Sequence, residues 1–326
     1  ALNAALLRAG QWLPLDPPDD GGATIGGVVA AGLSGAQAFG YGAPRQFVLG
    51  MKVALADGRA IKAGGGVVKN VAGYDMCKLF TSSRGTLGLI TELTFKLRPR
   101  PAREATLVAL GSHPTELIKA ARSILNAQLL PVAVELLSPR LATSIAAAAD
   151  DSTQALLVRF AGSEQAVEAQ LNQSRLLLAT DARVNVGEPA DDASIWRGLA
   201  ALAYRGDQCL IWRAGVRPGE LPVLLGAIEE AASRAGTHIN WHAGIADGRL
   251  RAFQQVEAGL VPLISMLEEL RRQAQGWGGS LVVEQAPAEL WQKFDPWGLG
   301  NPVVALMRRV KHQLDPEGRL APGCFG

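Results

Sequence analysis

The sequence has few cysteines, and none of them has the spacing of a metal site. Cys77, Cys209 and Cys324 are the only cysteines among 326 residues, and long segments separate them. A disulfide framework or a metal centre needs cysteines in pairs or clusters. The pattern therefore argues against a disulfide framework and against an iron–sulfur cluster within this chain, and it is typical of a reducing compartment.

Clusters of basic residues are missing as well. The formal net charge is +2, and no segment is rich enough in Lys and Arg to follow a phosphate backbone. Nucleic acid is therefore excluded as a partner. No basic segment precedes an apolar core at the N-terminus, so no signal peptide is predicted. The opening ALNAALLRAG has the pattern of the middle of an amphipathic helix, and we expect the natural start of the chain to lie upstream of it.

Charge is absent between Asp20 and Arg45, where glycine recurs at positions 26, 27, 32, 35, 40 and 42. Glycine lets backbone N–H groups approach a ligand closely. The stretch therefore predicts backbone wrapped around a large, flat or phosphorylated ligand, and a packed loop is the alternative. Its length suits a bilayer, but the glycines, polar residues such as Ser34 and the closing Pro44 exclude a membrane helix. No transmembrane segment is predicted.

The rest of the first hundred residues is predicted to consist of short elements. They are a helix over 1–9, an extended connection over 11–20, a hairpin of strands 51–56 and 59–62, a loop and short helix over 69–80, a glycine loop over 81–88 and a strand over 89–97. The dipeptide Asp57-Gly58 predicts a type I′ turn in the hairpin. The prolines of RPRP at 98–101 mark a domain boundary.

After this boundary, strands and helices alternate in a regular order. We expect strands over 105–110, 132–137, 155–160, 209–214, 238–242, 250–256 and 280–284, and helices over 114–127, 163–178, 218–236 and 259–276. Two successive strand–helix–strand groups are typical of a ferredoxin-like unit. Two such units can pair into one sheet with helices on one face. A further helix is predicted over 303–313, before the turns of the C-terminal tail.

Three segments together point to a family. KNVAGYDMCKLFTSSRGTLGLITE, at 69–92, resembles the second flavin-binding signature of the vanillyl-alcohol-oxidase type of FAD oxidoreductases. ATIGG at 23–27, with Tyr41-Gly42, resembles the first. With the ending LMRRVKHQLDPEGRLAPG, the chain is similar to the FAD-binding E subunits of bacterial glycolate oxidase. The similarity is dense over 10–101, moderate over 275–326 and mostly architectural between them.

The resemblance implies an α+β protein with FAD as its cofactor. It implies a PCMH-type FAD-binding domain over 1–101 whose first lobe lies upstream of Ala1, a ferredoxin-like cap over 102–290, and a segment over 291–326 that returns to the FAD domain. The implied activity is oxidation of a 2-hydroxy acid such as glycolate, with electrons passed to a partner. The implied partners are a catalytic flavoprotein subunit and an iron–sulfur subunit, in the cytoplasm or at the inner membrane face.

The same resemblance assigns cofactor contacts in both signatures. Backbone amides would surround the FAD diphosphate, Arg45 would supply charge, and Ile90 would contribute its backbone. The assigned residues are Thr24, Ile25, Gly26, Gly27, Gly32, Ser34, Gly42, Arg45, Ser83, Gly85, Gly88 and Ile90. The alternative is that many of these glycines only allow the chain to turn. Two positions depart from the family pattern, because Ser82 replaces a glycine and Ala321 replaces an asparagine.

Candidates for catalysis are fewer. His238 and His242 lie four residues apart on a predicted strand, or ~13 Å, which is too far for one metal ion to bridge. His242 is the best candidate for a proton acceptor, and a structural histidine pair is the alternative. Arg249 and Arg251 could pair with a substrate carboxylate or line a solvated strand edge. Glu284 could face the cleft or cap the next helix. Two functions remain open, an FAD-dependent oxidoreductase subunit and a non-catalytic scaffold that assembles partner subunits.

Overall fold

The computed structural model describes residues 2–19, 21–65, 74–146, 148, 150–179, 184–189, 191–203, 208–256 and 259–324. The chain divides into two compact units. Unit 1 consists of residues 1–100 and 299–326, and unit 2 of residues 101–298. The C-terminal segment thus completes the unit that the N-terminal segment begins. Each unit is described by itself.

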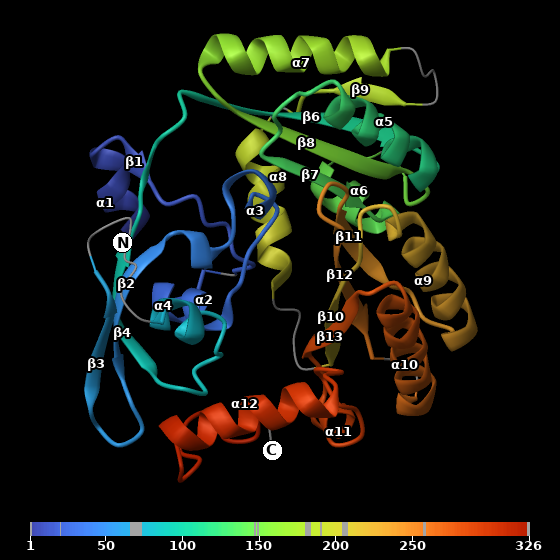
Figure 1. Ribbon diagram of the computed structural model, residues 1–326. Coiled ribbons are helices and arrows are strands. Elements are labelled where there is room, and N and C mark those ends of the chain that lie inside the picture. Colours follow the sequence, from blue (N-terminus) through green and yellow to red (C-terminus); the bar gives the residue numbers. More distant parts are fainter. Residues whose placement is uncertain are drawn as a thin grey trace. The chain divides into compact units, whose positions relative to one another are not determined.

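Unit 1 is built on a three-stranded antiparallel sheet of order β3-β2-β4, with a separate two-stranded pair of β1 and β5 (Figure 1). Its elements are α1 (Leu2–Arg8), β1 (Gln11–Trp12), α2 (Ile25–Ala31), α3 (Ala38–Tyr41), η1 (Pro44–Gln46), β2 (Val48–Ala54), β3 (Ala60–Gly64), α4 (Met76–Phe80), β4 (Leu89–Phe95), β5 (Arg98–Pro99) and α12 (Asn301–Leu314).

The core of unit 1 joins segments from both ends of the chain. Val29 of α2, Val53 of β2 and Phe80 of α4 are completely buried there. Val310 and Leu314 of α12 pack against this cluster. Val310 and Leu314 are partly buried, and because removal of apolar surface from water is favourable, their contacts help to hold α12 against this core.

The hairpin of β2 and β3 forms as predicted, but the predicted type I′ turn is wrong. The turn is closed by the hydrogen bond from Gly58 N to the Leu55 carbonyl (3.0 Å), so its central residues are Ala56 and Asp57. A type I′ turn requires a positive φ at both central residues, and neither has one. Gly58, with φ of 85°, follows the turn instead. The Asp57 carboxylate accepts hydrogen bonds from the backbone N (3.0 Å) and Nε (2.6 Å) of Arg59, which favours this three-residue loop.

Unit 2 contains one eight-stranded antiparallel sheet of order β13-β10-β12-β11-β7-β8-β6-β9. Its strands are β6 (Arg103–Gly111), β7 (Ala133–Leu137), β8 (Gln154–Gly162), β9 (Asn185–Gly187), β10 (Cys209–Gly215), β11 (Asn240–Gly244), β12 (Arg249–Gln255) and β13 (Ser280–Gln285). Its helices are α5 (Pro114–Asn126), α6 (Pro139–Ala146), α7 (Glu164–Leu178), α8 (Asp192–Ala200), η2 (Ala201–Ala203), α9 (Leu221–Ala235), α10 (Leu260–Gly276) and α11 (Ala288–Trp291).

The sheet order confirms the prediction of two ferredoxin-like units in one sheet. In each half the strands are ordered 4-1-3-2, as β9-β6-β8-β7 and as β13-β10-β12-β11. The halves join through β7 and β11, where His242 pairs with Leu137. Two reciprocal hydrogen bonds extend the joint, from Trp241 N to Ser138 Oγ (3.0 Å) and from Ser138 N to the Trp241 carbonyl (2.9 Å).

Helices α6 and α8 were not predicted. Asp191 caps α8, since its carboxylate accepts a hydrogen bond from Ser194 N (3.1 Å). Trp196 of α8 donates its indole N–H to Thr106 Oγ1 (2.8 Å), and the Arg159 guanidinium lies over its ring. These contacts place α8 on the face of the sheet that carries Thr106 and Arg159. Among the described residues, no helix combines the length and the hydropathy that crossing a lipid bilayer would require.

Candidate functional site

The two glycine-rich segments of unit 1 lie side by side. Ser82 N donates a hydrogen bond to the Val29 carbonyl (3.0 Å), and Arg84 N donates to the Ala30 carbonyl (2.6 Å). These bonds attach the loop of residues 82–88 to the C-terminal end of α2. The described parts of the two segments that resemble the flavin signatures, about 50 residues apart in sequence, therefore lie against each other and form one backbone surface. Residues 69–73 of the second segment lie outside the described residues.

Close approach explains one glycine of this surface, Gly32, but not Gly26. Gly32 ends α2 in the left-handed conformation, with φ of 66°, and a Cβ there would overlap the Ser82 side chain. At Gly26 a Cβ would lie 3.6 Å from the Ile90 carbonyl oxygen of β4. Because glycine lacks a Cβ, α2 can approach the loop closely at Gly32, whereas the distance at Gly26 is an ordinary van der Waals contact that a Cβ could make.

The loop itself has an unusual backbone. Ser82, Arg84 and Gly85 have φ of 68°, 54° and 73°, and the first two are not glycine. A side chain in this region is strained and persists only where its surroundings enforce it. The hydrogen bonds to α2 supply part of that enforcement. Thr86 supplies more, since its Oγ1 donates to the Ser83 carbonyl (2.6 Å).

The predicted turn at 24–27 is the first turn of α2. Thr24 is the N-cap, and its hydroxyl accepts a hydrogen bond from Gly27 N (3.1 Å). The Thr24 side chain is therefore used for capping. Thr24, Ile25 and Gly27 are exposed, so this end of the helix is open to a ligand.

The remaining predicted contacts lie in different local settings. Ser34 follows α2, and Gly42 ends α3 with φ of 100°. Arg45, in η1, is exposed; together with the larger influence of Lys78, its charge lowers the pKa of Asp75. Gly88 has a packing role, because a Cβ there would overlap Val53 of the core. These four residues illustrate that residue type alone does not separate ligand contacts from packing.

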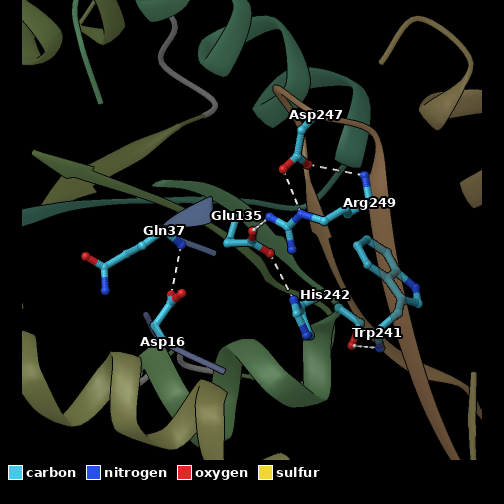
Figure 2. Close-up of polar contacts among 8 residues, drawn as sticks. Asp16, Gln37, Glu135, Trp241, His242, Asp247 and Arg249 are labelled. Carbon is cyan, nitrogen blue, oxygen red and sulfur yellow. Dashed lines mark hydrogen bonds and ion pairs between the residues drawn. The ribbon is translucent and has the colours of Figure 1, made fainter. Parts of the chain in front are cut away.

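Two buried polar atoms near these segments lack partners among the described residues. Ser83 Oγ, in the loop, and Gln37 Oε1 accept or donate no hydrogen bond there. The backbone N of Gln37 donates to Asp16 Oδ2 (2.8 Å), as Figure 2 shows. Buried polar groups are normally paired, so these two atoms are candidates for a hydrogen bond to a bound polar group.

Unit 2 contains a buried ionic network, also shown in Figure 2. Glu135 of β7 is completely buried, and its two oxygens bind His242 Nδ1 (2.9 Å) and Arg249 Nη2 (2.9 Å). Arg249 Nε also donates to Asp247 Oδ2 (2.7 Å). Gly244 of β11 lies opposite Glu135 on β7 and opposite Arg249 on β12. His242 lies two residues before Gly244 on the same strand. Because strand side chains alternate, all three side chains occupy one face.

The network sets the ionisation of its members. Burial alone would raise the pKa of Glu135, but the charge of Arg249 and the hydrogen bond from His242 outweigh it and lower that pKa. For Asp247, burial outweighs Arg249, and its pKa is raised. Glu135 is therefore an ionised carboxylate at neutral pH. When the His242 ring is neutral, this contact favours the tautomer that carries the proton on Nδ1, in which Nε2 is a hydrogen-bond acceptor.

Two other predicted residues of unit 2, Glu284 and Arg251, are paired with each other. The carboxylate of Glu284 binds Arg251 (2.6 Å) and Arg213 (3.2 Å), so it neither caps a helix nor stands alone. His238 precedes β11, which begins at Asn240, so the predicted strand over 238–242 is shifted and the two histidines do not share it. Among the described residues, no group of three His, Cys, Asp or Glu side chains is arranged to hold a metal ion.

Glu135 is the residue that the sequence pattern missed. The only available signal was an acidic residue inside the apolar strand AVELL. Such a residue requires a buried cationic or hydrogen-bonding partner. The partners are 107 and 114 residues away in the chain.

Comparison with known proteins identifies the family. The C-terminal domain of FAD linked oxidases matches residues 100–250 and 291–324, more than half of the chain. This chain belongs to the family of FAD linked oxidases. An FAD binding domain matches residues 1–64, which include the first glycine segment. The predictions of FAD as cofactor and of an FAD-dependent oxidoreductase are thereby confirmed.

Individual relatives agree with this family. The glycolate oxidase subunit GlcE of Escherichia coli is 30% identical to this FAD-linked oxidase, over 92% of this chain and 77% of its own. The glycolate oxidase subunit GlcD of Bacillus subtilis is 26% identical, over 98% and 71%. An alkyldihydroxyacetonephosphate synthase structure matches with a TM-score of 0.71 at 17% identity, which confirms the predicted fold. The match covers 99% of this chain, which spans 62% of that structure.

Proposed function

We propose that the backbone surface formed by α2 and the loop 82–88 binds the diphosphate and ribityl parts of FAD. The observation that carries this proposal is the direct hydrogen bonding between the two segments, at Val29–Ser82 and Ala30–Arg84. The surface contains no acidic side chain that would repel phosphate, and amide dipoles can bind an anion without lysines. The unpaired, buried Ser83 Oγ fits a polar ligand at the same place.

We further propose that the substrate is a 2-hydroxy acid such as glycolate, because two relatives are named glycolate oxidase subunits. FAD supplies the hydride acceptor when it is bound. The chain would supply the proton acceptor, His242 Nε2, to which the substrate hydroxyl gives its proton. Glu135 holds the ring and stabilises the imidazolium that results. Arg251 Nη1 is buried without a partner among the described residues and would bind the substrate carboxylate.

Electrons would then pass to a partner. The relatives GlcD and GlcE are both named as subunits. We propose that this chain also acts within a complex that contains a second flavoprotein subunit and an iron–sulfur subunit. The spacing of Cys77, Cys209 and Cys324 does not suit an iron–sulfur cluster in this chain, which supports an electron acceptor outside it.

A non-catalytic scaffold is the second candidate, and a specific observation favours it. Arg249 and Arg251 both pair with carboxylates of the chain itself, and the His242 side chain is only 9% exposed. A substrate would have to compete with these internal partners. In this case the chain would fold with its partner subunits and contribute no proton acceptor.

Two measurements test these functions. FAD titration of the purified chain, followed by flavin fluorescence, should show saturable binding; lack of binding would exclude the FAD site. Glycolate-dependent dye reduction should then fall at least a hundredfold in kcat for His242→Gln, because a general base contributes about 10²–10⁴-fold. His238→Gln serves as the control, since His238 precedes β11. Equal activity of His242→Gln and the control, with partners present, would support the scaffold.

A further inference from the structure

Lys311, near the end of α12, connects the C-terminal tail to the loop 82–88. Its Nζ donates to the carbonyl of Thr86 (3.1 Å), to the carbonyl of Leu320 (2.8 Å) and to Asp315 Oδ2 (2.8 Å). An ammonium group has three N–H donors, and these three acceptors match that number. The side chain is largely buried, with 18% of its surface exposed. Thr86 precedes Lys311 by 225 residues.

Asp315 fixes the other side of this arrangement. Its side chain is completely shielded, and its carboxylate also accepts hydrogen bonds from Arg319 N (2.9 Å) and Leu320 N (2.8 Å). Asp315 therefore folds the tail back so that the Leu320 carbonyl faces Lys311. The tail and the ammonium form one unit, which we name the Lys311 clasp and define as Lys311, Asp315 and Leu320.

The clasp contacts the strained loop near its C-terminal end, whereas α2 contacts it near its N-terminal end. Ser82 and Arg84 are held by the carbonyls of α2, at the start of the loop. Thr86 receives the clasp at its carbonyl and holds Ser83 through its own side chain. The loop is thus attached at both ends. A backbone with two non-glycine residues at positive φ needs such attachment, because it would otherwise relax.

We propose that Lys311 is a positioning residue for FAD, which sets the conformation of the loop 82–88 from its C-terminal end. This inference rests on the proposed FAD contacts of that loop. Lys311 itself does not touch the cofactor, because its three donors are bound within the chain. Its effect is carried by the Thr86 carbonyl to Ser83 and Gly85, whose backbone would face the ligand.

The test compares Lys311→Met and Lys311→Arg with Lys52→Met in the full chain. Lys52 is the matched control, since it forms an exposed ion pair with Glu92 in the same unit. Lys311→Met keeps the length of the side chain and removes the donors. We expect at least a tenfold weaker FAD Kd, a changed absorption spectrum of bound FAD, and faster hydrogen exchange at 82–88 without ligand. Lys311→Arg should recover part of the affinity, and Lys52→Met should remain within twofold of the wild type.

Three results would overturn the proposal. The first is an unchanged Kd and unchanged exchange in Lys311→Met. The second is faster exchange throughout β2, β3 and β4, which would indicate general destabilisation of unit 1. The third is wild-type protein that binds no FAD, which also removes the proposed function. Hydrogen exchange at 82–88 in the ligand-free protein separates a failure of the FAD site from a failure of the clasp. It shows whether Lys311 orders the loop even if the wild type binds no FAD.

Discussion

At the scale of single residues, the clearest physical conflict is a serine in a backbone position that suits glycine. Ser82 has φ of 68°, and its side chain lies against Gly32. We expect Ser82→Gly to stabilise the chain by about 1 kcal/mol, since the left-handed conformation costs a side chain roughly 1–2 kcal/mol and glycine loses more backbone entropy on folding. Urea unfolding of both proteins measures this difference.

Gly32 provides a coupled control for this prediction. Gly32→Ala should destabilise the wild type strongly, because the new Cβ overlaps Ser82 and φ at this position is 66°. In the Ser82→Gly background the overlaps with Oγ and Cβ are gone and only the 3.3 Å approach to Cα remains, so the destabilisation should be smaller. Equal effects of Gly32→Ala in both backgrounds would show that the two residues do not interact.

A second residue of this kind is Ala321, which has φ of 42°. Asparagine adopts the left-handed region several-fold more readily than alanine does. Ala321→Asn should therefore stabilise the tail, by up to about 1 kcal/mol. Hydrogen exchange at residues 315–320 is the measurement, and no increase in protection would contradict the prediction.

The sequence identified both positions as unusual, but it did not show why a residue that tolerates positive φ is preferred there. Ser82 and Ala321 depart from a family pattern of glycine and asparagine, and those two residue types share a tolerance for positive φ. The pattern therefore predicted which positions are unusual. That Ser82 bonds to the Val29 carbonyl depends on two segments meeting in space, and no local signal encodes that contact.

At the scale of elements, the strands of unit 2 are joined by side-chain ion pairs as well as by backbone hydrogen bonds. Glu135 of β7 holds His242 of β11 and Arg249 of β12. Glu135→Gln should destabilise unit 2 by about 3 kcal/mol, because removing one member leaves buried charge without its partner. Thermal unfolding measures the loss. Glu168→Gln is the control, since the exposed pair of Glu168 with Arg103 should matter little.

The tail of unit 1 gives a prediction of pH dependence. The hydrogen bond from Lys311, with those from Leu320 and Arg319, lowers the pKa of Asp315 from 3.8 to about 2. A carboxylate with a depressed pKa stabilises the folded state above its unfolded pKa. The clasp should therefore be intact above about pH 4 and be lost as the pH falls through about 2.

Hydrogen exchange of the tail between pH 4 and pH 2 tests this window. Asp315→Asn should lack the clasp at every pH, so its relative protection should not change across the window. An identical pH dependence in Asp315→Asn and the wild type would show that another group causes it. The control region is β3, which is not part of the clasp.

Elements were predictable where their signal is local. The strands and helices from β10 to β13 were predicted from hydrophobic periodicity, because neighbouring residues determine which face of each element is apolar. Their succession along the chain then indicated a ferredoxin-like unit. Helix α8 was missed, since its position depends on Trp196 packing on Arg159 from another element. The Asp57-Gly58 turn was wrong because Arg59 adds a side-chain contact that the dipeptide does not contain.

At the scale of the whole molecule, the chain consists of two compact units, and the tryptophans are divided unequally between them. The seven tryptophans include Trp12 in unit 1, and the other six lie in unit 2. Tryptophan fluorescence therefore reports mainly on unit 2. A method that reads unit 1 directly, such as hydrogen exchange of β2 and β4, is needed to follow the proposed FAD site.

This division leads to a prediction about the cofactor. A ligand that binds only the folded state stabilises it by about 2.7 kcal/mol at a concentration of 100 Kd. Because all proposed diphosphate and ribityl contacts belong to unit 1, FAD should slow exchange of the most protected amides of β2 and β4 about a hundredfold. The amides of β6 and β8 should change less. Equal protection of both sets would contradict the assignment of the FAD contacts to α2 and the loop 82–88, because the binding energy would then be shared by both units.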